Sequence, residues 1–317
     1  MKKETWLITG GAGFIGSNLI NYLLKKKQKI ICLDNFINGD INNLKEKISK
    51  NLIIIKCDIR KPPEKILKYK VHYLIHLAAL GSVPRSFESP EETNSVNVDG
   101  SIKIMNLAHR LKCKSFVFAS SSSVYGDSKN KAKKENDKKK PISPYGNSKL
   151  AFEIYSQILS KHYNLKTVGI RFFNVFGPNQ NIKGPYAAVI PKWVSGLKKN
   201  LKIFVNGDGS TSRDFTYVEN VIKGILLSAK YKNKSKYNIF NIACGREIKL
   251  KYLLKKIISN LKINPKHIKV EYKDFKNGDI KRSRANINYA KKTLKYYPNI
   301  SFEDGLKKYI NSIKVTN

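Results

Sequence analysis

Cysteine, arginine, acidic residues and long apolar runs are all scarce in this chain of 317 residues. The four cysteines lie far apart without a Cys-x-x-Cys pair, and the five histidines show no metal-ligand spacing, so neither a disulfide framework nor a metal site is indicated. No apolar run approaches the roughly 18 residues of a membrane span, and the N-terminus does not resemble a signal peptide. We therefore expect a cytoplasmic protein without a membrane partner.

Acidic residues are too few to balance the basic ones: 23 against 61, which gives a net charge of +38. Such an excess is typical of nucleic-acid-binding proteins. However, only eight of the basic residues are Arg, and the lysines are spread over the whole chain. The densest run, residues 129–140, has no aromatic side chains for base stacking. We interpret it as a solvated loop that binds polyanions weakly at low salt, and expect no specific nucleic-acid partner.

A glycine-rich turn stands near the N-terminus. The apolar stretch 5–9 predicts a buried strand, residues 10–16 contain Gly-x-Gly-x-x-Gly, and a helix is expected from Ser17 to about Lys26. Such a turn brings backbone N–H groups and a helix N-terminus to a pyrophosphate. A second strand, 29–33, ends at Asp34, whose carboxylate would accept from ribose hydroxyls and repel a 2′-phosphate. This favours NAD over NADP; the alternative is an Asp that only caps a turn.

Strands and helices then alternate along the first half of the chain. Strands are expected at 52–56, 73–77, 115–119 and 165–171, with a helix at 94–112. This pattern predicts a Rossmann-type, doubly wound parallel sheet over residues 1–174. Residues 175–317 predict a smaller mixed α/β domain, some segments of which return to the first domain. Its expected elements are helices at 186–199, 218–230 and 249–261 and strands at 202–205 and 237–242.

Tyr145 and Lys149 are four residues apart on a predicted helix that runs to about Lys161, with Ser143 as N-cap and Pro144 as first residue. Both side chains project from the same side of such a helix. The lysine charge and the helix N-terminus would favour the phenolate, so that the tyrosine acts as a base. The alternative is that the spacing is incidental, because it is common on helices. One apolar face of this helix is expected to hold Ala151, Ile154, Tyr155, Ile158 and Leu159.

These motifs together resemble the extended short-chain dehydrogenase/reductase family over nearly the whole chain. The resemblance is carried by 9–16, Asp34-Asn35, 120–126, Tyr145-x-x-x-Lys149 and 171–177. The chain looks most like bacterial UDP-N-acetylglucosamine 4-epimerases, through 77–86, 186–193 and 206–215. The resemblance implies NAD-dependent epimerisation of a UDP-hexose at C4, through a transient 4-keto sugar, with a tightly bound NAD that each turnover regenerates.

The resemblance also implies roles for particular residues. Ser121 would join Tyr145 and Lys149 as a catalytic residue and hydrogen-bond the sugar O4, and Lys149 would also hold the nicotinamide ribose. The NAD-binding residues would be Gly10, Gly13, Phe14, Ile15, Gly16, Asp34, Asn35, Phe36, Asn38, Gly39, Asp58, Ile59, Leu77, Ala78, Ala79, Asn97, Tyr145, Lys149 and Val175.

The substrate site would take residues from both halves of the chain. Asn174 and Arg213 would bind the pyrophosphate, and Asp279 the uridine ribose. Lys276 stands where Arg is common in this group, so it would meet a phosphate without a bidentate fork. The other members would be Ser82, Ser121, Ser122, Ser123, Tyr145, Val189, Ile190, Lys192, Trp193, Phe204, Val205, Asn206 and Ser283.

Several related reactions can be weighed from single residues. The similar 4,6-dehydratases carry an Asp-Glu pair where this chain has Ser122 and Ser123, and the decarboxylases a nearby Glu that is absent here. Asp34 argues against an NADP-dependent reductase. A polyanion-binding protein on an inactive Rossmann scaffold would explain the charge, yet it would not need Ser121, Tyr145 and Lys149 together.

The choice of sugar is left open between N-acetylated, unmodified and uronic substrates. Ser283 stands where similar epimerases restricted to unacetylated sugars carry Tyr, so a small side chain here would leave space for a 2-acetamido group; the alternative is an ordinary surface serine. The resemblance also implies a homodimer, formed by the helices at 94–112 and from 145 onwards. Leu107, Leu111, Phe152, Tyr155 and Leu159 would supply that face or the core of the chain itself.

Overall fold

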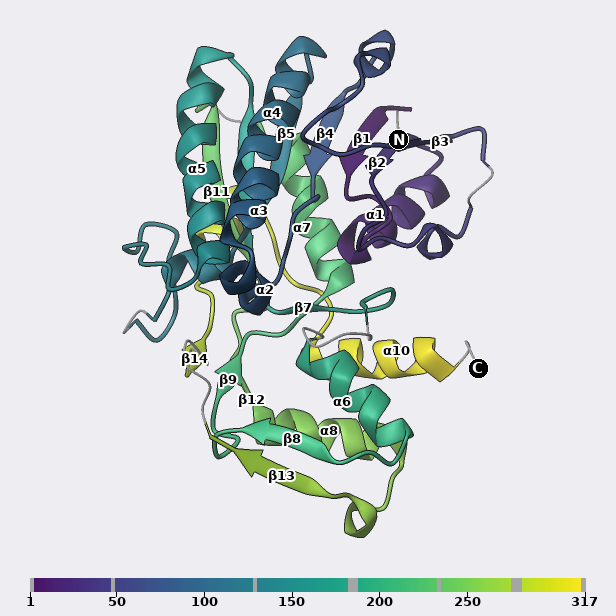
Figure 1. Cartoon of the computed structure of the whole chain (residues 1–317), viewed down its shortest axis with the longest axis vertical. Helices are drawn as coiled ribbons and strands as arrows, with labels where there is room; N and C mark the ends of the chain where they lie inside the picture. The colour runs from purple at the N-terminus through teal and green to yellow at the C-terminus, as the bar shows by residue number, and fades with distance from the viewer. Residues whose placement is uncertain are drawn as a thin grey trace.

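The computed structural model shows a large lobe built on a parallel sheet and a smaller lobe below it (Figure 1). It describes residues 3–46, 49–127, 130–181, 188–232, 235–274 and 281–314. Lys276 and Asp279, two of the predicted substrate residues, therefore lie outside the described part of the chain. No helix within the described residues is long and apolar enough to cross a membrane.

A seven-stranded parallel sheet forms the centre of the large lobe, which confirms the expected Rossmann-type fold. The strand order is β11-β6-β5-β4-β1-β2-β3, so the winding direction reverses between β1 and β4. Ligands bind at such a reversal in open α/β sheets. The strands are β1 (Thr5–Thr9), β2 (Lys29–Asp34), β3 (Leu52–Lys56), β4 (Tyr73–His76), β5 (Ser115–Ser121), β6 (Thr167–Phe172) and β11 (Tyr237–Ile242).

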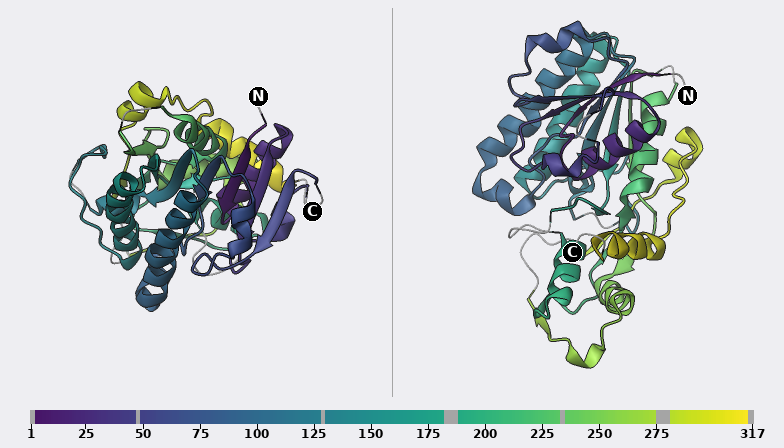
Figure 2. Two further views of the ribbon diagram at one scale, coloured as in Figure 1. Left: turned by 90° about the horizontal axis from the view of Figure 1, so that it is seen from above. Right: turned by 90° about the vertical axis from the view of Figure 1, so that its right-hand side faces the viewer.

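Helices cover both faces of this sheet (Figure 2). On one face lie α1 (Phe14–Lys25) and α7 (Val218–Lys230), and on the other α4 (Ser101–Arg110) and α5 (Pro144–His162). Adjacent strand residues serve opposite layers: Trp6 and Ile8 pack with the α1 side, and Leu7 with the α4 side. The strands are therefore apolar throughout rather than alternating, as expected of a sheet buried on both faces.

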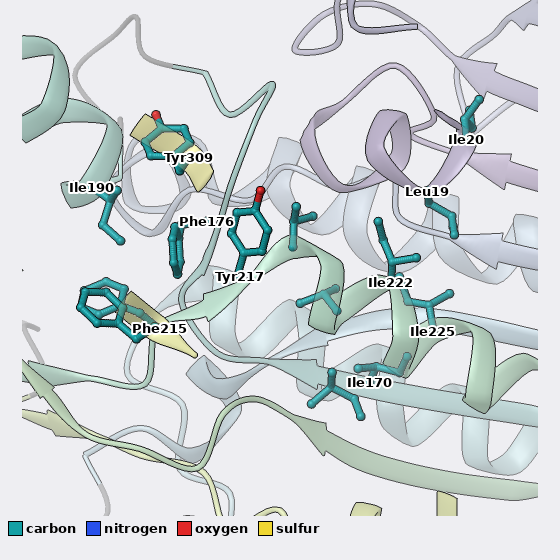
Figure 3. Packing of buried hydrophobic residues seen from close by; sticks show 14 of the residues in the cluster. Leu19, Ile20, Ile170, Phe176, Ile190, Phe215, Tyr217, Ile222, Ile225 and Tyr309 are labelled. Atoms are coloured by element: carbon teal, nitrogen blue, oxygen red, sulfur yellow. The ribbon is translucent and has the colours of Figure 1, made fainter. Parts of the chain in front are cut away.

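The core continues from the sheet into the smaller lobe. Figure 3 shows Leu19 and Ile20 of α1 near Ile222 and Ile225 of α7, and farther along Phe176, Phe215 and Tyr217, all of one apolar cluster. The elements of the smaller lobe and its junction are β7 (Val175–Phe176), α6 (Val189–Lys198), β8 (Ile203–Asn206), β9 (Ser212–Arg213), β10 (Thr216–Tyr217), β12 (Ile248–Lys249), α8 (Leu250–Leu261), β13 (Val270–Lys273), β14 (Arg282–Ser283), α9 (Asn288–Leu294) and α10 (Phe302–Lys314).

One helix differs from the sequence-based expectations, and two other elements agree with them. The helix predicted at 94–112 is divided into α3 (Pro90–Asn94), a π-helical turn (Ser95–Gly100) and α4. The strand at 237–242 joins the large sheet beside β6. The helix α5 begins at Pro144 with Ser143 as N-cap, as predicted, since the Gly146 N–H donates to Ser143 Oγ (3.1 Å).

The face of α5 that packs on the sheet was not foreseen. Its buried residues are small or polar, apart from Phe152: Gly146, Ser148, Lys149, Glu153, Ser156 and Ser160. The predicted apolar face is largely outside, since Ile154, Tyr155 and Ile158 are 54%, 48% and 62% exposed. Small side chains allow the helix to lie close to the strands, which explains the arrangement.

The lysine-rich run is also more ordered than a solvated loop. Lys133 is buried, and the segment around it pairs with the chain near β14. The Lys133 N–H donates to the Arg284 carbonyl, and the Asn286 N–H donates to the Lys133 carbonyl (both 2.8 Å). Main-chain pairing of this kind does not depend on the side chains, so composition alone could not predict it.

Candidate active site

The described residues enclose a cavity of about 760 Å³ at the carboxyl ends of β1, β4 and β5, where the strand order reverses. Most of the predicted cofactor residues and all three predicted catalytic residues line it. The lining residues that the sequence predicted are Gly10, Gly13, Phe14, Ile15, Gly16, Asp34, Asn35, Asn38, Gly39, Asp58, Ile59, Leu77, Ala78, Ala79, Ser82, Ser121, Ser122, Ser123, Tyr145, Lys149, Asn174 and Val175.

The glycine-rich turn between β1 and α1 is shaped by close backbone contacts. A Cβ at Gly16 would stand 2.1 Å from the Gly10 carbonyl oxygen, and Gly10 itself has φ +66°. Both positions therefore require glycine. The helix begins at Phe14 with Gly13 as N-cap and no side chain bonded to its first amides. This end of α1 faces the cavity and suits an anionic pyrophosphate.

Asp34 at the end of β2 is buried and held by the backbone on both sides. Its Oδ2 accepts from the Ala12 N–H (2.9 Å) and its Oδ1 from the Phe36 N–H (2.8 Å). The carboxylate is thereby fixed at the cavity wall, where it would accept from a ribose diol and repel a phosphate. The glycine turn and this carboxylate together fit NAD.

Asp58, farther along the same wall, belongs to a charged cluster. Arg60 donates to it through Nε (3.0 Å) and Nη2 (2.6 Å), and contacts Glu92 through Nη1 (3.1 Å). The hydrogen bonds from Arg60 hold the pKa of Asp58 below its usual value. Arg60 and Glu92 line the cavity although the sequence analysis did not assign them. The scarcity of arginine is the one sequence signal that could have drawn attention to Arg60.

The predicted catalytic residues meet at the inner end of the cavity. Tyr145 and Lys149 lie on the first turns of α5, and Ser121 is the last residue of β5. Lys149 is buried, its Nζ donates to the Ala119 carbonyl (3.1 Å), and it lies 5.9 Å from the centre of the Tyr145 ring. The strand end and the helix start thus bring together three groups that are distant in sequence.

Burial governs the protonation of this group. It raises the pKa of Tyr145, and a hydrogen bond with Ser121 opposes that rise. Burial lowers the pKa of Lys149 to about 8, while the charge of Glu153 opposes the decrease. In the protein alone, desolvation of the phenol is the larger effect on the Tyr145 pKa, and the expectation that Lys149 favours the phenolate stays a prediction.

A second polar group supports the cofactor wall from below. His76 is buried at the end of β4, with Nδ1 2.6 Å from Thr9 Oγ1 and Nε2 2.8 Å from Ser101 Oγ. Because the Ser101 hydroxyl donates to the Asn97 carbonyl, its oxygen accepts from Nε2–H. Burial, with a smaller effect of Lys149, lowers the pKa of His76 to about 3, so the ring is neutral.

Asn97 lies in the π-helical turn and does not line the cavity itself. Its Oδ1 accepts from the Leu80 N–H (2.8 Å), and its Nδ2 donates to the Leu80 carbonyl (3.1 Å) and to Ser148 Oγ (3.1 Å). The side chain therefore joins the loop after β4 to the helix that carries Tyr145 and Lys149. Of the other predicted cofactor residues, Phe36 supports Asp34 from outside the cavity.

The predicted substrate residues of the smaller lobe do not line the described cavity. Ile190, Trp193 and Val205 are buried in the core, and the Trp193 indole donates to the Phe204 carbonyl (3.1 Å). Ser283 is buried and paired with Arg213 between β14 and β9. Val189, Lys192, Phe204 and Asn206 occupy α6 and β8. Their assignment to the substrate stays a prediction.

Other cavity residues had no assignment in the sequence. Arg85 lies on the short helix α2 (Val83–Glu88), and its Nη2 is 3.5 Å from Oδ1 of Asn38, a predicted cofactor residue. Asn179 follows the small strand β7, where the sequence offers no periodicity to place it. The remaining residues of this kind are Leu33, Ile37, Cys57, Leu80, Gly81, Val83, Val96, Ala119, Ser120, Phe172, Gln180, Asn181 and Ala188.

The fold and this cavity define an NAD-binding enzyme of the Rossmann class, and comparison with known proteins gives its family. Residues 6–243 match the model of the NAD dependent epimerase/dehydratase family. The chain belongs to this family, and its cofactor is NAD. It is an enzyme, an isomerase of the epimerase class, as the relatives below indicate.

Relatives of known description match almost the whole chain. A putative UDP-glucose 4-epimerase of Methanocaldococcus jannaschii is 33% identical, over 98% of this chain and 99% of that protein. A UDP-glucuronate 4-epimerase of Thermodesulfobacterium geofontis is 32% identical, over 96% and 95%.

Solved structures of epimerases match equally well. A UDP-N-acetylglucosamine 4-epimerase from Methanobrevibacter ruminantium, in complex with UDP-N-acetylmuramic acid, has a TM-score of 0.94 with 36% identity over the full length of both chains. A UDP-glucose 4-epimerase of Thermotoga maritima, with UDP-glucose, has a TM-score of 0.90 with 28% identity over 98% and 99%.

Proposed function

We propose that this protein is an NAD-dependent UDP-sugar 4-epimerase and that its principal reaction interconverts UDP-N-acetylglucosamine and UDP-N-acetylgalactosamine. The observation that carries the proposal is the meeting of Ser121, Tyr145 and Lys149 at the inner end of the NAD cavity. The named activities of the relatives, with UDP-glucose, UDP-glucuronate and UDP-N-acetylglucosamine, support the common reaction.

The reaction needs a base at the sugar O4 and a hydride acceptor at C4. NAD, when bound, would take the hydride from C4 and return it to the opposite face of the sugar, and its positive ring would favour the phenolate. Tyr145 would remove the O4 proton and give it back after the 4-keto sugar has turned. Ser121 would share that hydrogen bond, and the Lys149 ammonium would stabilise the negative charge on the phenolate.

The serines that follow the catalytic hydroxyl support epimerisation over dehydration. Ser122 and Ser123 line the cavity, and the Ser123 N–H donates a hydrogen bond to Ser121 Oγ (3.1 Å). Loss of water from C5 and C6 needs a further acid and base, and hydroxyls of ordinary pKa are poor at both roles. The site is therefore suited to hydride transfer and return alone.

The preference for an N-acetylated sugar rests on Ser283. Its neighbour across the strand pair is Arg213, the predicted pyrophosphate ligand, so a larger side chain at 283 would intrude beside the nucleotide sugar. We expect Ser283→Tyr to reduce kcat/KM for UDP-N-acetylglucosamine by about tenfold or more, a steric cost of 1–3 kcal/mol, and to spare UDP-glucose. Equal losses on both substrates would contradict the preference.

The direct test is incubation of the purified protein with each UDP-sugar, followed by chromatographic separation of the C4 epimers. UDP-N-acetylglucosamine should give UDP-N-acetylgalactosamine without added NAD, with a higher kcat/KM than UDP-glucose or UDP-glucuronate. Conversion of only UDP-glucose or only UDP-glucuronate would retain the epimerase and replace the substrate. No conversion of any of them, with NAD supplied, would refute the proposed function.

We further propose a homodimer formed through α5. Ile154, Tyr155 and Ile158 give this helix an exposed apolar stripe, whereas Leu107 and Phe152 belong to the core of the chain. A second copy is the occupant that the fold offers, because the same stripe on two antiparallel helices is self-complementary. We expect a dimer in light scattering and a monomer for Ile158→Lys. A monomeric wild-type protein at micromolar concentration would contradict the proposal.

A further inference from the structure

We propose that the buried ion pair of Glu153 and Arg171 is a positioning device, which holds the catalytic serine strand against the catalytic helix and sets the charge of Lys149. This inference rests on the proposed function, because it assigns a role in the same catalytic group. Glu153 and Arg171 are 4% and 1% exposed. Neither side chain lines the cavity.

Arg171 and Glu153 form a bidentate ion pair. Arg171 Nε donates to Glu153 Oε1 (2.9 Å) and Nη2 to Oε2 (2.6 Å), and Nη1 donates to the Tyr125 hydroxyl (2.8 Å) and the Glu135 carbonyl (2.9 Å). Glu153 also accepts from the Ser120 hydroxyl. Removing two charges from water is costly even with such geometry, so stability alone is a weak reason to keep them.

The position of the pair explains what it can do. Glu153 lies one helical turn after Lys149 on the buried face of α5, and Ser120 directly precedes Ser121 at the end of β5. Arg171 stands opposite Ser120 in the register of β5 and β6. The Glu153 carboxylate thus joins the helix of Tyr145 and Lys149 to the strand of Ser121, at the level where the three groups meet.

The charges around Lys149 are few and come from three elements. On α5 it faces Glu153 and the Tyr145 phenol, on β4 the neutral His76, and on β6 Arg171 stands behind Glu153. Of the residues that the structure describes, Glu153 is the one whose charge opposes the loss of the lysine proton in this buried place. Without it, Lys149 would deprotonate at lower pH, and the unpaired Arg171 would act in the same direction.

The test is the pH–rate profile of UDP-N-acetylglucosamine conversion by Glu153→Gln and Glu153→Asp. For Glu153→Gln we expect at least a tenfold loss of kcat, less than a twofold change in KM, and an alkaline limb about one pH unit lower, because one neighbouring charge is lost. The variant Glu153→Asp keeps the negative charge on a shorter side chain. For it we expect a lower kcat and an alkaline limb at the same pH as in the wild type.

Two matched controls separate this role from general stability. Glu64→Gln breaks the exposed pair with Arg110, and should change neither kcat nor the profile. Tyr125→Phe disturbs the far side of Arg171 and leaves the charge of Glu153 in place, so it should lower the melting temperature without moving the limb. An unshifted limb in Glu153→Gln, with kcat lowered equally at all pH values, would overturn the proposal.

A titration of Lys149 by NMR of ¹³C-labelled lysine tests the same inference without turnover. The Lys149 signal is identified by its loss in the Lys149→Met variant of each protein. Loss of the Glu153 charge should let Lys149 deprotonate at lower pH; an unmoved titration would overturn the inference. If the wild type converts no UDP-sugar, the proposed function fails, and this titration still decides the role of Glu153.

Discussion

The cavity at the sheet and the smaller lobe below it differ in how their residues are placed. Around the cavity, functional groups stand within a few residues of a strand end or a helix start, as Asp34, Ser121 and Tyr145 do. In the smaller lobe, predicted substrate residues are part of the packing: Ile190, Trp193 and Val205 are all at most 3% exposed. Backbone geometry places the groups of the first region, and packing between distant segments places those of the second.

The largest expected effect is that of a substitution at a predicted catalytic residue in the cavity. Tyr145→Phe removes the phenolic oxygen that would take the O4 proton and leaves the ring in place. We expect kcat to fall by about 10³-fold, within the range for loss of a general base. The affinity for NAD, measured by fluorescence, should not change. A loss smaller than tenfold would mean that another group is the base.

A smaller effect concerns how the stability of the folded protein depends on pH through His76. Burial lowers the pKa of His76 from its ordinary value of 6.5 to about 3, so the unfolded chain takes up a proton first as pH falls. This contribution to stability is present above pH 6.5 and is lost on acidification, by about 2 kcal/mol between pH 6.5 and 5.

The variant His76→Gln tests that contribution by urea unfolding at both pH values. The amide keeps a donor and an acceptor but does not titrate, so the decrease in unfolding free energy between pH 6.5 and 5 should be smaller by about 2 kcal/mol. An equal decrease in both proteins would show that His76 is not the group responsible.

The smallest expected effect is that of a substitution at Arg213 in the smaller lobe. Arg213→Lys keeps the charge and removes the planar fork, so we expect KM for the UDP-sugar to rise by about tenfold, or 1.4 kcal/mol, with little change in kcat. Isothermal titration with UDP should give the same ratio. Unchanged UDP affinity would place the pyrophosphate away from Arg213.

The difference between the two regions also explains what the sequence predicted. The strands from β1 to β6 and the helices α1, α5 and α7 follow from apolar runs, glycines and the Ser143 cap, and their expected bounds agree within a few residues. The predicted residues that line the cavity follow from motifs at the ends of those elements and from the family resemblance that those motifs carry.

The rest depended on contacts between distant segments. The Glu153–Arg171 pair joins residues that no local pattern connects, and Lys133 is buried by pairing with the chain near Arg284. The helical periodicity predicted that Ile154 and Ile158 would lie on a buried face, yet both are exposed. The small side chains on the other face of α5 pack against the sheet instead. Patterns locate elements and motifs, and packing decides which face of an element is buried.

The most direct test of the central claim, transient oxidation at C4 by a retained NAD, follows a label through the reaction. UDP-N-acetylglucosamine with deuterium at C4 is converted in ordinary water, and the product is examined by mass spectrometry and NMR. The proposed mechanism predicts that deuterium remains at C4 of UDP-N-acetylgalactosamine, because the hydride leaves and returns within one cavity. Exchange of the label with solvent would contradict it.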